Sequence, residues 1–461
     1  MIFQKTPDSA KQIANELVRE ETREVSMRVM SDPQVYEMEM ETIFQKTWIF
    51  LGHDTEIPKA GDFVTRKIGN DAVIVSRAAS GDVHVFLNVC PHRGMRVCGV
   101  DSGNSALHRC IYHGWAFRSD GSFFGAPVER EQMHGKMTPK SELGLKNAKV
   151  HIYNGFIFAT WNENPEPFDD FLGDMKYYMD TLVARTDNGL EVLGPPQRVR
   201  IRGNWKTAGE QSTGDGFHTL TLHRSLMEAG QMGGSGDSIY DNAPAMYGQN
   251  ISTDQGHGGR CIPPEMTFSA VMGTDIDKCS VEERLDRLPP PGLTREMIPQ
   301  IYRHLDEGQI EVLARSPLQA GGLFPNASFV FLFAPDVNGE FVGLLGMHLF
   351  QPLGPDEMEL YTWLFAEKDA PEDMKRRMRA VGVQAVGSSG VIEQDDTETW
   401  SVITQSSKGV MGSRGTLKYQ AITGEHTKPA DWPGPGHVYD GFTKDDTQWN
   451  WWVAYKNALA S

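Results

Sequence analysis

The strongest constraint on this chain is a pair of short segments that each offer one cysteine and one histidine. The first begins CPHRG at Cys90 and contains His92, and the second begins CIYHGW at Cys110 and contains His113. Two such loops can grip a two-iron cluster from opposite sides, with both thiolates on one iron and both imidazoles on the other. The pattern therefore predicts a Rieske [2Fe-2S] centre.

A Cys₂His₂ zinc site uses the same ligand types and is the main alternative. Zinc sites of that kind usually pair cysteine with cysteine and histidine with histidine. Here each segment mixes the two, and Gly94 and Gly114 suit tight turns whose backbone N–H groups can bond to cluster sulfurs. The spacing favours the Rieske cluster over zinc and over a chance association.

The other three cysteines, Cys98, Cys261 and Cys279, have no partner motif and are interpreted as small packed apolar residues. An odd set of five cysteines is not typical of a disulfide framework. The first residues are polar and mixed in charge, unlike a secretory signal, and no apolar run approaches the roughly 20 residues needed to cross a bilayer. We expect a cytoplasmic protein that does not associate with membranes.

The size and composition allow two or three domains, because the chain has 461 residues and 39% of them are hydrophobic. A net charge of -17 without a basic stripe argues against a nucleic-acid partner. Between about Trp48 and Trp161, short β-branched and aromatic runs separated by turn residues predict a small antiparallel β domain. The remainder mixes helical and strand patterns, so the predicted fold class is α+β.

We expect an N-terminal helical segment over residues 1–40 and an all-β Rieske domain over 41–163. A catalytic domain over 164–461 should then hold an antiparallel sheet flanked by helices, in a helix-grip (START-like) arrangement. Apolar spacing predicts a helix over residues 9–30. The glycine-rich stretch Gly230–Gly259 is predicted to be a mobile loop near the mouth of a substrate site.

A second candidate metal site begins with two histidines, His218 and His223. Five residues correspond to about 140° around an ideal helix, so both can face one metal only where the helix is broken or carries a π-type distortion. Gly214 and Gly216 make such an irregularity inexpensive. Asp215 lies three residues before His218, close to it on the same helical face.

Two histidines and one carboxylate form the facial triad of non-haem Fe(II) oxygenases, which leaves positions open for O₂. The candidate carboxylates are Asp395 and Asp396 in VIEQDDTETW. Taken alone, histidines at this spacing are more often surface or core residues, and an Asp pair more often begins a helix. A cluster that moves one electron at a time needs a second redox site, however, and most of the chain remains to hold one.

Together these residues resemble the α subunits of bacterial ring-hydroxylating dioxygenases of the naphthalene/biphenyl type. The resemblance covers nearly the whole chain, including TWIFLGHDTEIPKAGDF (47–63), both cysteine–histidine segments, NWKTAGEQSTGDGFHTLTLH, FPNASF (324–329) and EQDDTETW. It implies one Rieske [2Fe-2S] cluster and one mononuclear Fe(II) per chain. The implied cluster ligands are Cys90, His92, Cys110 and His113, and the implied iron ligands are His218, His223 and Asp396.

The resemblance also implies that Asp215 joins the partner subunit's His113 to His218, so that electrons pass between subunits. It therefore implies an α3 trimer or, with a small β subunit, an α3β3 assembly, supplied from NADH by a reductase and a ferredoxin. The chain departs from the usual ENxxDxYH pattern, because Gln211 replaces Asn and Phe217 replaces Tyr. Neither position is a ligand, but the departure puts in doubt the hydrogen bonds around the iron.

The positions that line the family's substrate pocket are occupied here by Gln211, Ser212, Gly216, Thr219, Val386 and Ile392. Several are smaller than the aromatic residues common there, which predicts a roomy pocket for a bicyclic or polycyclic aromatic. Alternatively, other bulky side chains fill the space. His257 and Arg260 could contact a carboxylate, which keeps aromatic acids such as salicylate open.

The expected function is that of a terminal oxygenase α subunit, an NADH-dependent aromatic ring dioxygenase that inserts both atoms of O₂ to give a cis-dihydrodiol. A Rieske monooxygenase or demethylase with the same metals is the nearest alternative. A purely electron-carrying Rieske protein would leave the triad unexplained, and a zinc-stabilised interaction protein predicts a colourless preparation.

Overall fold

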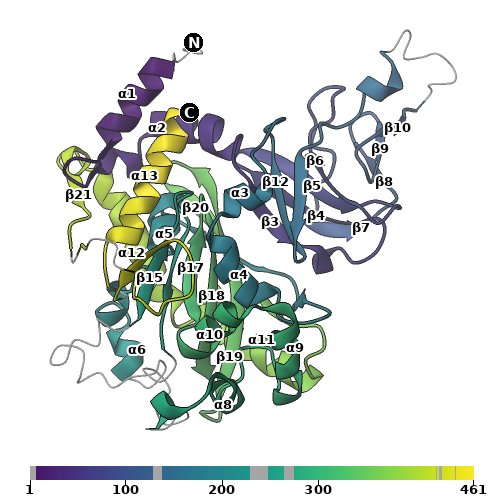
Figure 1. Ribbon diagram of the computed structural model, residues 1–461. Coiled ribbons are helices and arrows are strands. Elements are labelled where there is room, and N and C mark those ends of the chain that lie inside the picture. Colours follow the sequence, from purple (N-terminus) through teal and green to yellow (C-terminus); the bar gives the residue numbers. More distant parts are fainter. Residues whose placement is uncertain are drawn as a thin grey trace. The chain divides into compact units, whose positions relative to one another are not determined.

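The computed structural model describes residues 7–127, 138–228, 248–263, 275–421, 423–424, 428–441 and 443–461. The chain divides into two compact units, which Figure 1 shows with their elements labelled. We call Ile43–Phe168 the β unit. The remainder, up to Thr42 and from Asp169 onwards, is called the large unit.

The β unit is built from three small antiparallel sheets. One has four strands in the order β6-β5-β4-β7, and the other two have three strands each, in the orders β10-β9-β8 and β11-β12-β3. The strands are β3 (Ile49–His53), β4 (Asp62–Ile68), β5 (Asp71–Arg77), β6 (Val83–Leu87), β7 (Ser102–Asn104), β8 (Leu107–Arg109), β9 (Ala116–Arg118), β10 (Phe123–Gly125), β11 (Lys149–Tyr153) and β12 (Phe156–Thr160). The small antiparallel β domain predicted from the sequence is present.

The core of the β unit is aromatic and reaches the two cysteine segments. Phe86 and Phe117 are fully buried in one cluster with Cys90 and Cys110. Burying these rings anchors the loops that follow β6 and β8, since apolar burial is the main stabilising contribution in a small domain.

The large unit is organised around a nine-stranded antiparallel sheet in the order β13-β20-β19-β18-β17-β16-β15-β22, with β14 also paired to β20. Its strands are β13 (Leu190–Val192), β14 (Gln197–Ile201), β15 (Gln249–Ser252), β16 (Gly258–Cys261), β17 (Leu318–Leu323), β18 (Ala327–Pro335), β19 (Phe341–Gly354), β20 (Glu357–Glu367) and β22 (His437–Asp440). Strands β18 to β20 follow one another along the chain and pair as neighbours in the sheet.

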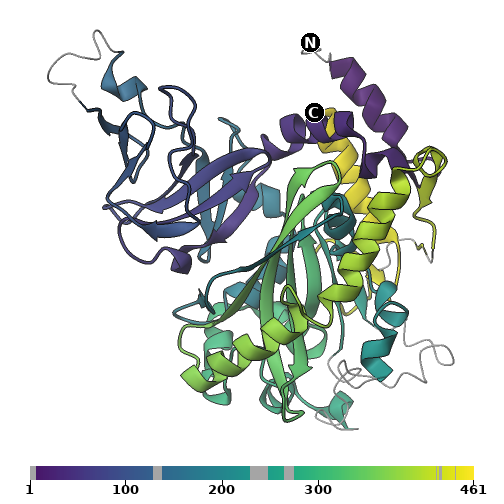
Figure 2. The same cartoon turned by 180° about the vertical axis from the view of Figure 1, so that it is seen from behind.

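The described residues also form α-helices. They are α1 (Pro7–Leu17), α2 (Pro33–Glu39), α3 (Phe168–Leu172), α4 (Met175–Val183), α5 (Trp205–Gln211), α6 (Arg224–Glu228), α8 (Val281–Arg287), α9 (Ile298–His304), α10 (Glu307–Arg315), α11 (Glu372–Val386), α12 (Glu393–Ser407) and α13 (Asp446–Ala460). Figure 2 shows the yellow-green helices α11 and α12 across one face of the sheet. There, Val381 and Ala385 of α11 pack on Leu344 and Leu364.

The expected α+β class is confirmed, because an all-β unit accompanies a unit of antiparallel sheet and helices. None of the helices in the described ranges is long and apolar enough to cross a membrane.

The predicted helix over residues 9–30 is wrong in its second half. Helix α1 ends at Leu17 and is followed by β1 (Val18–Arg19) and β2 (Glu24–Ser26). Arg23 turns the chain with a positive φ of 51°. Strand β2 pairs with β21 (Thr416–Lys418), so hydrogen bonds to a distant segment override the local helical pattern.

The glycine-rich stretch Gly230–Gly259 is not one loop. Its last part forms β15 and the start of β16, which are held between β22 and β17. Pairing with neighbouring strands explains why this part is not the predicted loop. Glycine is accepted in a strand where another backbone approaches closely. Residues 229–247 lie outside the described part.

Candidate metal centres

The two cysteine segments of the β unit fold into matching turns. The N–H of Cys90 donates to Met95 O (2.8 Å), and the N–H of Gly94 donates to Cys90 O (2.9 Å). Cys110 and Gly114 repeat both bonds with Trp115 and Cys110 as acceptors, at 2.8 and 2.9 Å.

Glycine closes each turn for a steric reason. Gly94 and Gly114 both have a φ of +73°, a conformation that side chains disfavour. A Cβ at Gly114 would also lie 2.5 Å from Pro127. The two turns therefore present their cysteine and histidine in the same way.

The four side chains suit a two-iron cluster better than a single ion. Cys90 and Cys110 are buried free thiols, and the rings of His92 and His113 lie 4.5 Å apart. A four-coordinate zinc ion would draw all four ligand atoms together. Within the described residues, however, this quartet does not bring three ligand atoms within 4.8 Å of one another.

The environment of the Cys90 thiol also fits a cluster. Burial raises its pKa, and the neighbouring Cys110 raises it further, whereas backbone N–H groups of His92 and Arg93 lower it. N–H groups directed at a sulfur stabilise a thiolate bound to metal. A metal that replaces both protons would stabilise two neighbouring buried thiols as thiolates.

The second centre lies in the large unit where helix α5 breaks. Asn204 caps α5 by accepting a hydrogen bond from Lys206 N, and the helix ends at Gln211. Gly214 then takes a φ of +121°, and a Cβ there would lie 3.0 Å from Gly259 O. The next helical residues are a short 3-10 turn, His218–Leu220. The break that the histidine spacing requires is therefore present.

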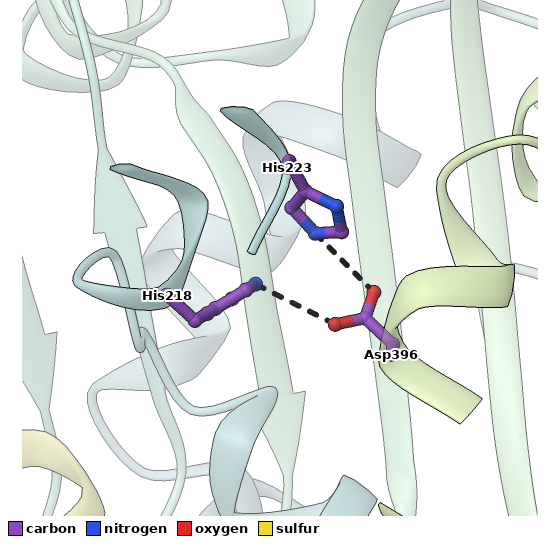
Figure 3. Close-up of side chains that lie close together, drawn as sticks. All are labelled: His218, His223 and Asp396. Carbon is purple, nitrogen blue, oxygen red and sulfur yellow. Dashed lines mark ion pairs between the residues drawn. The ribbon is translucent and has the colours of Figure 1, made fainter. Parts of the chain in front are cut away.

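Helix α12 supplies the carboxylate. Asp396 lies in its first turn, with Oδ1 3.7 Å from His218 Nε2 and Oδ2 3.5 Å from His223 Nε2 (Figure 3). Nitrogen and oxygen ligands bind divalent metals at about 2.0–2.2 Å, so atoms at these separations can share one ion. His218, His223 and Asp396 are the one such group of three among the described residues.

Each histidine is oriented by a second carboxylate. His218 Nδ1 lies 3.1 Å from Asp215 Oδ2, and His223 Nδ1 lies 3.2 Å from Asp395 Oδ2. An acceptor at Nδ1 leaves Nε2 as the ligand atom. Sequence reasoning missed this use of Asp395, although its position beside Asp396 was a signal. Asp215 was expected on the same helical face as His218, but the contact arises from a turn outside a helix.

Asp396 and His223 differ in how readily each takes the protonation state that binds a metal. Burial raises the pKa of Asp396, but its contacts with His223 and His218 and the Gln211 amide outweigh this and leave it low. Burial lowers the pKa of His223, but Asp396 and Asp395 outweigh this and leave it raised. A metal at this site would therefore find an ionised carboxylate and displace a proton from His223.

The predicted pocket residues occupy varied environments. Ser212 and Ile392 are partly exposed, Gly216 and Thr219 are buried around one hydrogen bond from Thr219 Oγ1 to Gly216 O (2.6 Å), and Val386 is buried in the α11 core. Gln211 donates a hydrogen bond to Asp396, a contact that its predicted pocket role did not include.

His257 cannot contact a substrate carboxylate as the sequence suggested. Its Nε2 lies 2.6 Å from Phe171 O, and its Nδ1 accepts a hydrogen bond from Phe324 N. Burial lowers its pKa to about 4. Both ring nitrogens are thus used in the fold. Arg260 hydrogen-bonds to Gln319 Oε1 (3.0 Å) and to the backbone oxygen of Asp215.

Two family models match the chain. The Rieske [2Fe-2S] domain matches residues 47–146, and the ring hydroxylating alpha subunit (catalytic domain) matches residues 168–426. The chain is 35% identical to biphenyl 2,3-dioxygenase subunit alpha of Rhodococcus jostii (strain RHA1), over 86% of this chain and 80% of that one. It is 32% identical to N,N-dimethyl phenylurea N-demethylase subunit alpha of Sphingobium sp. (strain YBL2), over 94% and 91%.

Among solved structures, naphthalene 1,2-dioxygenase from Rhodococcus sp., bound to indole, superposes with a TM-score of 0.86 at 32% identity and 99% coverage of both chains. Fold and family matches together define a Rieske non-haem iron oxygenase, an oxidoreductase with one [2Fe-2S] cluster and one mononuclear iron. The chain belongs to the family of ring-hydroxylating dioxygenase alpha subunits.

Proposed function

We propose that this chain is the terminal oxygenase α subunit of a ring-hydroxylating dioxygenase that acts on a bicyclic or polycyclic aromatic compound. Both atoms of O₂ enter adjacent ring carbons to give a cis-dihydrodiol. The reaction consumes the aromatic compound, O₂, NADH and one proton, and releases NAD⁺. A reductase and a ferredoxin carry the electrons.

The ligand roles are part of the proposal. Cys90, His92, Cys110 and His113 hold the cluster, and His218, His223 and Asp396 hold the iron. The single observation that carries the second assignment is that both Nε2 atoms lie within 3.7 Å of the Asp396 carboxylate. The iron supplies the oxygen chemistry, and three protein ligands leave positions open for it.

Asp215 is proposed to connect the two centres. It holds His218 through Nδ1 and remains partly exposed, so a group from another subunit can reach it. Its pKa lies below its usual value, because the hydrogen bonds and charge of His218 outweigh the effect of burial. An ionised Asp215 can accept a hydrogen bond from the partner subunit's His113, which requires an α3 or α3β3 assembly.

The substrate range is proposed from Ser212, Gly216 and Ile392, which add no aromatic ring near the triad. Small side chains at these positions would leave room for two or three fused rings. The naphthalene and biphenyl dioxygenases among the relatives support an aromatic hydrocarbon.

Monooxygenation of an aromatic compound with an acidic or carbonyl group is a second candidate. Arg260 has no carboxylate partner among the described residues, and its charge lies near Asp215 and Asp396. A guanidinium that is not held in a direct carboxylate pair can donate hydrogen bonds to an anionic oxygen. The relation to a phenylurea N-demethylase alpha subunit supports a reaction other than ring dihydroxylation.

The test begins with iron. The anaerobically purified protein should contain about three irons per chain, two in the cluster and one at the triad, with the EPR spectrum of a histidine-ligated cluster after dithionite reduction. His218→Ala should lose one iron and keep the cluster signal. A colourless zinc protein contradicts the proposal.

The reconstituted enzyme is then given naphthalene, phenanthrene and salicylate, and its products are identified. Dihydrodiols from the hydrocarbons support the dioxygenase. Activity on salicylate alone overturns the hydrocarbon proposal and favours the monooxygenase.

A further inference from the structure

Gln211 lies between Asp396 and Trp400 at the end of helix α5. Its Nε2 donates to Asp396 Oδ1 at 2.7 Å, and its Oε1 accepts from Trp400 Nε1 at 2.5 Å. Asp396 and Trp400 are buried and stand one turn apart on helix α12. One amide thus bridges two positions of α12 from a different helix.

Trp400 determines which way the Gln211 amide points. A glutamine amide has nearly the same shape after a flip that exchanges its oxygen and nitrogen. The indole N–H can only donate, so it requires the amide oxygen on its side. The amide nitrogen is then the only group that Gln211 can offer to Asp396.

The bond to Asp396 fixes the carboxylate that would bind iron. Oδ1 receives the Gln211 proton and lies toward His218, whereas Oδ2 lies toward His223. A hydrogen bond to an ionised, buried oxygen is stronger than one in water and restricts rotation of the carboxylate. Without it, the carboxylate can turn away from either histidine.

We propose that Gln211 and Trp400 are positioning residues that together orient Asp396 as an iron ligand. We call this pair the amide brace. The inference rests on the proposed iron site and adds to it a supporting contact, beside the pocket-lining role expected for Gln211. Trp400 acts on Asp396 through Gln211, whose amide oxygen accepts its indole N–H.

The first test removes each hydrogen bond and keeps an apolar side chain at the same position. Gln211→Met loses both bonds, and Trp400→Phe loses the donor but keeps a ring against Phe350, whose centroid lies 5.7 Å away. Gln394→Met is the matched control, because Gln394 is an exposed glutamine on α12 that donates to Ser389 O. The dissociation constant for Fe(II) is measured by competition with a chelator.

Loss of a partner that orients a metal ligand typically weakens metal binding about 10–100-fold, and we expect this range for Gln211→Met. Trp400→Phe should weaken binding by about fivefold, the effect of one hydrogen bond. Gln394→Met should bind Fe(II) like the wild type. The visible spectrum of the Co(II)-substituted protein should change in both brace variants and not in the control.

The double variant Gln211→Met/Trp400→Phe tests whether the two residues act together or through unrelated effects on packing. If Trp400 acts only through Gln211, adding Trp400→Phe to Gln211→Met should cause no further loss of Fe(II) affinity. Independent effects would multiply, and that result overturns the coupling. Wild-type affinity and an unchanged Co(II) spectrum in Gln211→Met overturn the brace itself.

Failure of the proposed iron site has a different outcome. If His218→Ala keeps its third iron, the site is wrong, whatever Gln211 does. If His218→Ala loses that iron while Gln211→Met retains wild-type affinity, only the brace is overturned. Circular dichroism verifies that each variant is folded before its affinity is measured.

Discussion

Asp215 and His218 are joined within a single tight turn. Oδ2 of Asp215 lies 3.1 Å from His218 Nδ1, and its Oδ1 accepts hydrogen bonds from the backbone N–H groups of Phe217 and His218. The backbone itself therefore aims the carboxylate at the ring. This arrangement places a carboxylate beside Nδ1 of His218, while Nε2 of the same ring faces Asp396.

Asp215→Asn should separate electron delivery from metal binding. The amide keeps the size of the side chain but removes its charge, so we expect the cluster and the iron to remain bound. Oxidation of the reduced cluster in a single turnover should slow by about 10–100-fold, the usual effect of removing an outer partner of a ligand. Stopped-flow absorbance of the cluster measures this rate. Asp254→Asn, which alters an exposed Asp–His pair at 2.8 Å, is the control. Wild-type oxidation in Asp215→Asn would contradict the connecting role.

Iron binding should depend on pH through His223. Its pKa is raised, because Asp396 and Asp395 outweigh the opposing effect of burial. Fe(II) binds the neutral ring, so binding displaces a proton below that pKa. The apparent affinity should rise by up to about tenfold per pH unit until the proton is lost without metal. Titrations with Fe(II) from pH 6 to 8 test this, and an affinity that stays constant over the range contradicts it.

The buried pair of Lys206 and Glu39 should be strongly coupled. Lys206 Nζ lies 2.6 Å from Glu39 Oε1, both side chains are fully buried, and Trp205 and Tyr455 also donate to Glu39. Lys206→Met leaves the carboxylate without its counter-charge and should lower the free energy of unfolding by about 3–5 kcal/mol.

Two further variants complete that measurement by urea unfolding. Adding Glu39→Gln should recover part of the loss, because no buried charge then remains unpaired and an acceptor for Trp205 is kept. Lys176→Met breaks a partly exposed pair with Asp180 and should cost less than about 1 kcal/mol. Equal losses in Lys206→Met and Lys176→Met would mean that burial of the pair is unimportant.

Ile392→Phe should narrow the substrate range. Ile392 is partly exposed and stands one turn before Asp396 at the start of α12, and we propose that a larger ring there reduces the room for substrate. The ratio of phenanthrene to naphthalene turnover should fall, because three rings need more room than two. Val402→Phe adds a ring at an exposed position of the same helix and should leave the ratio unchanged. A fall in both variants would indicate a general effect on the helix.

Residue types and spacing predict which side chains the fold brings together around the two candidate metal centres. Cysteine and histidine in two matching loops predict a cluster, and a histidine spacing that misfits a helix predicts the break after α5. The choice of Asp396 over Asp395 came from the family resemblance. In the structure, Asp396 faces both Nε2 atoms and Asp395 faces an Nδ1.

Contacts between distant segments could not be predicted. The bond from Trp400 to Gln211 joins residues 189 positions apart, and nothing in either local sequence signals it. The same limitation explains the error near the N-terminus, where pairing of β2 with β21 ends a helical pattern. His257 was misassigned because the sequence does not show that its side chain is buried. In the fold, both of its ring nitrogens contact backbone groups.

The three proposed iron ligands lie on segments widely separated in the chain, His218 and His223 after α5 and Asp396 in α12. An ion bound by all three would act as a cross-link that closes a long loop of the polypeptide. Closing such a loop removes conformational entropy from the unfolded chain, and a ligand that binds only the folded state raises its melting temperature. We therefore expect bound iron to stabilise the fold in addition to taking part in the reaction. Calorimetry should show a higher melting temperature for the iron-loaded protein than for the same protein after chelation.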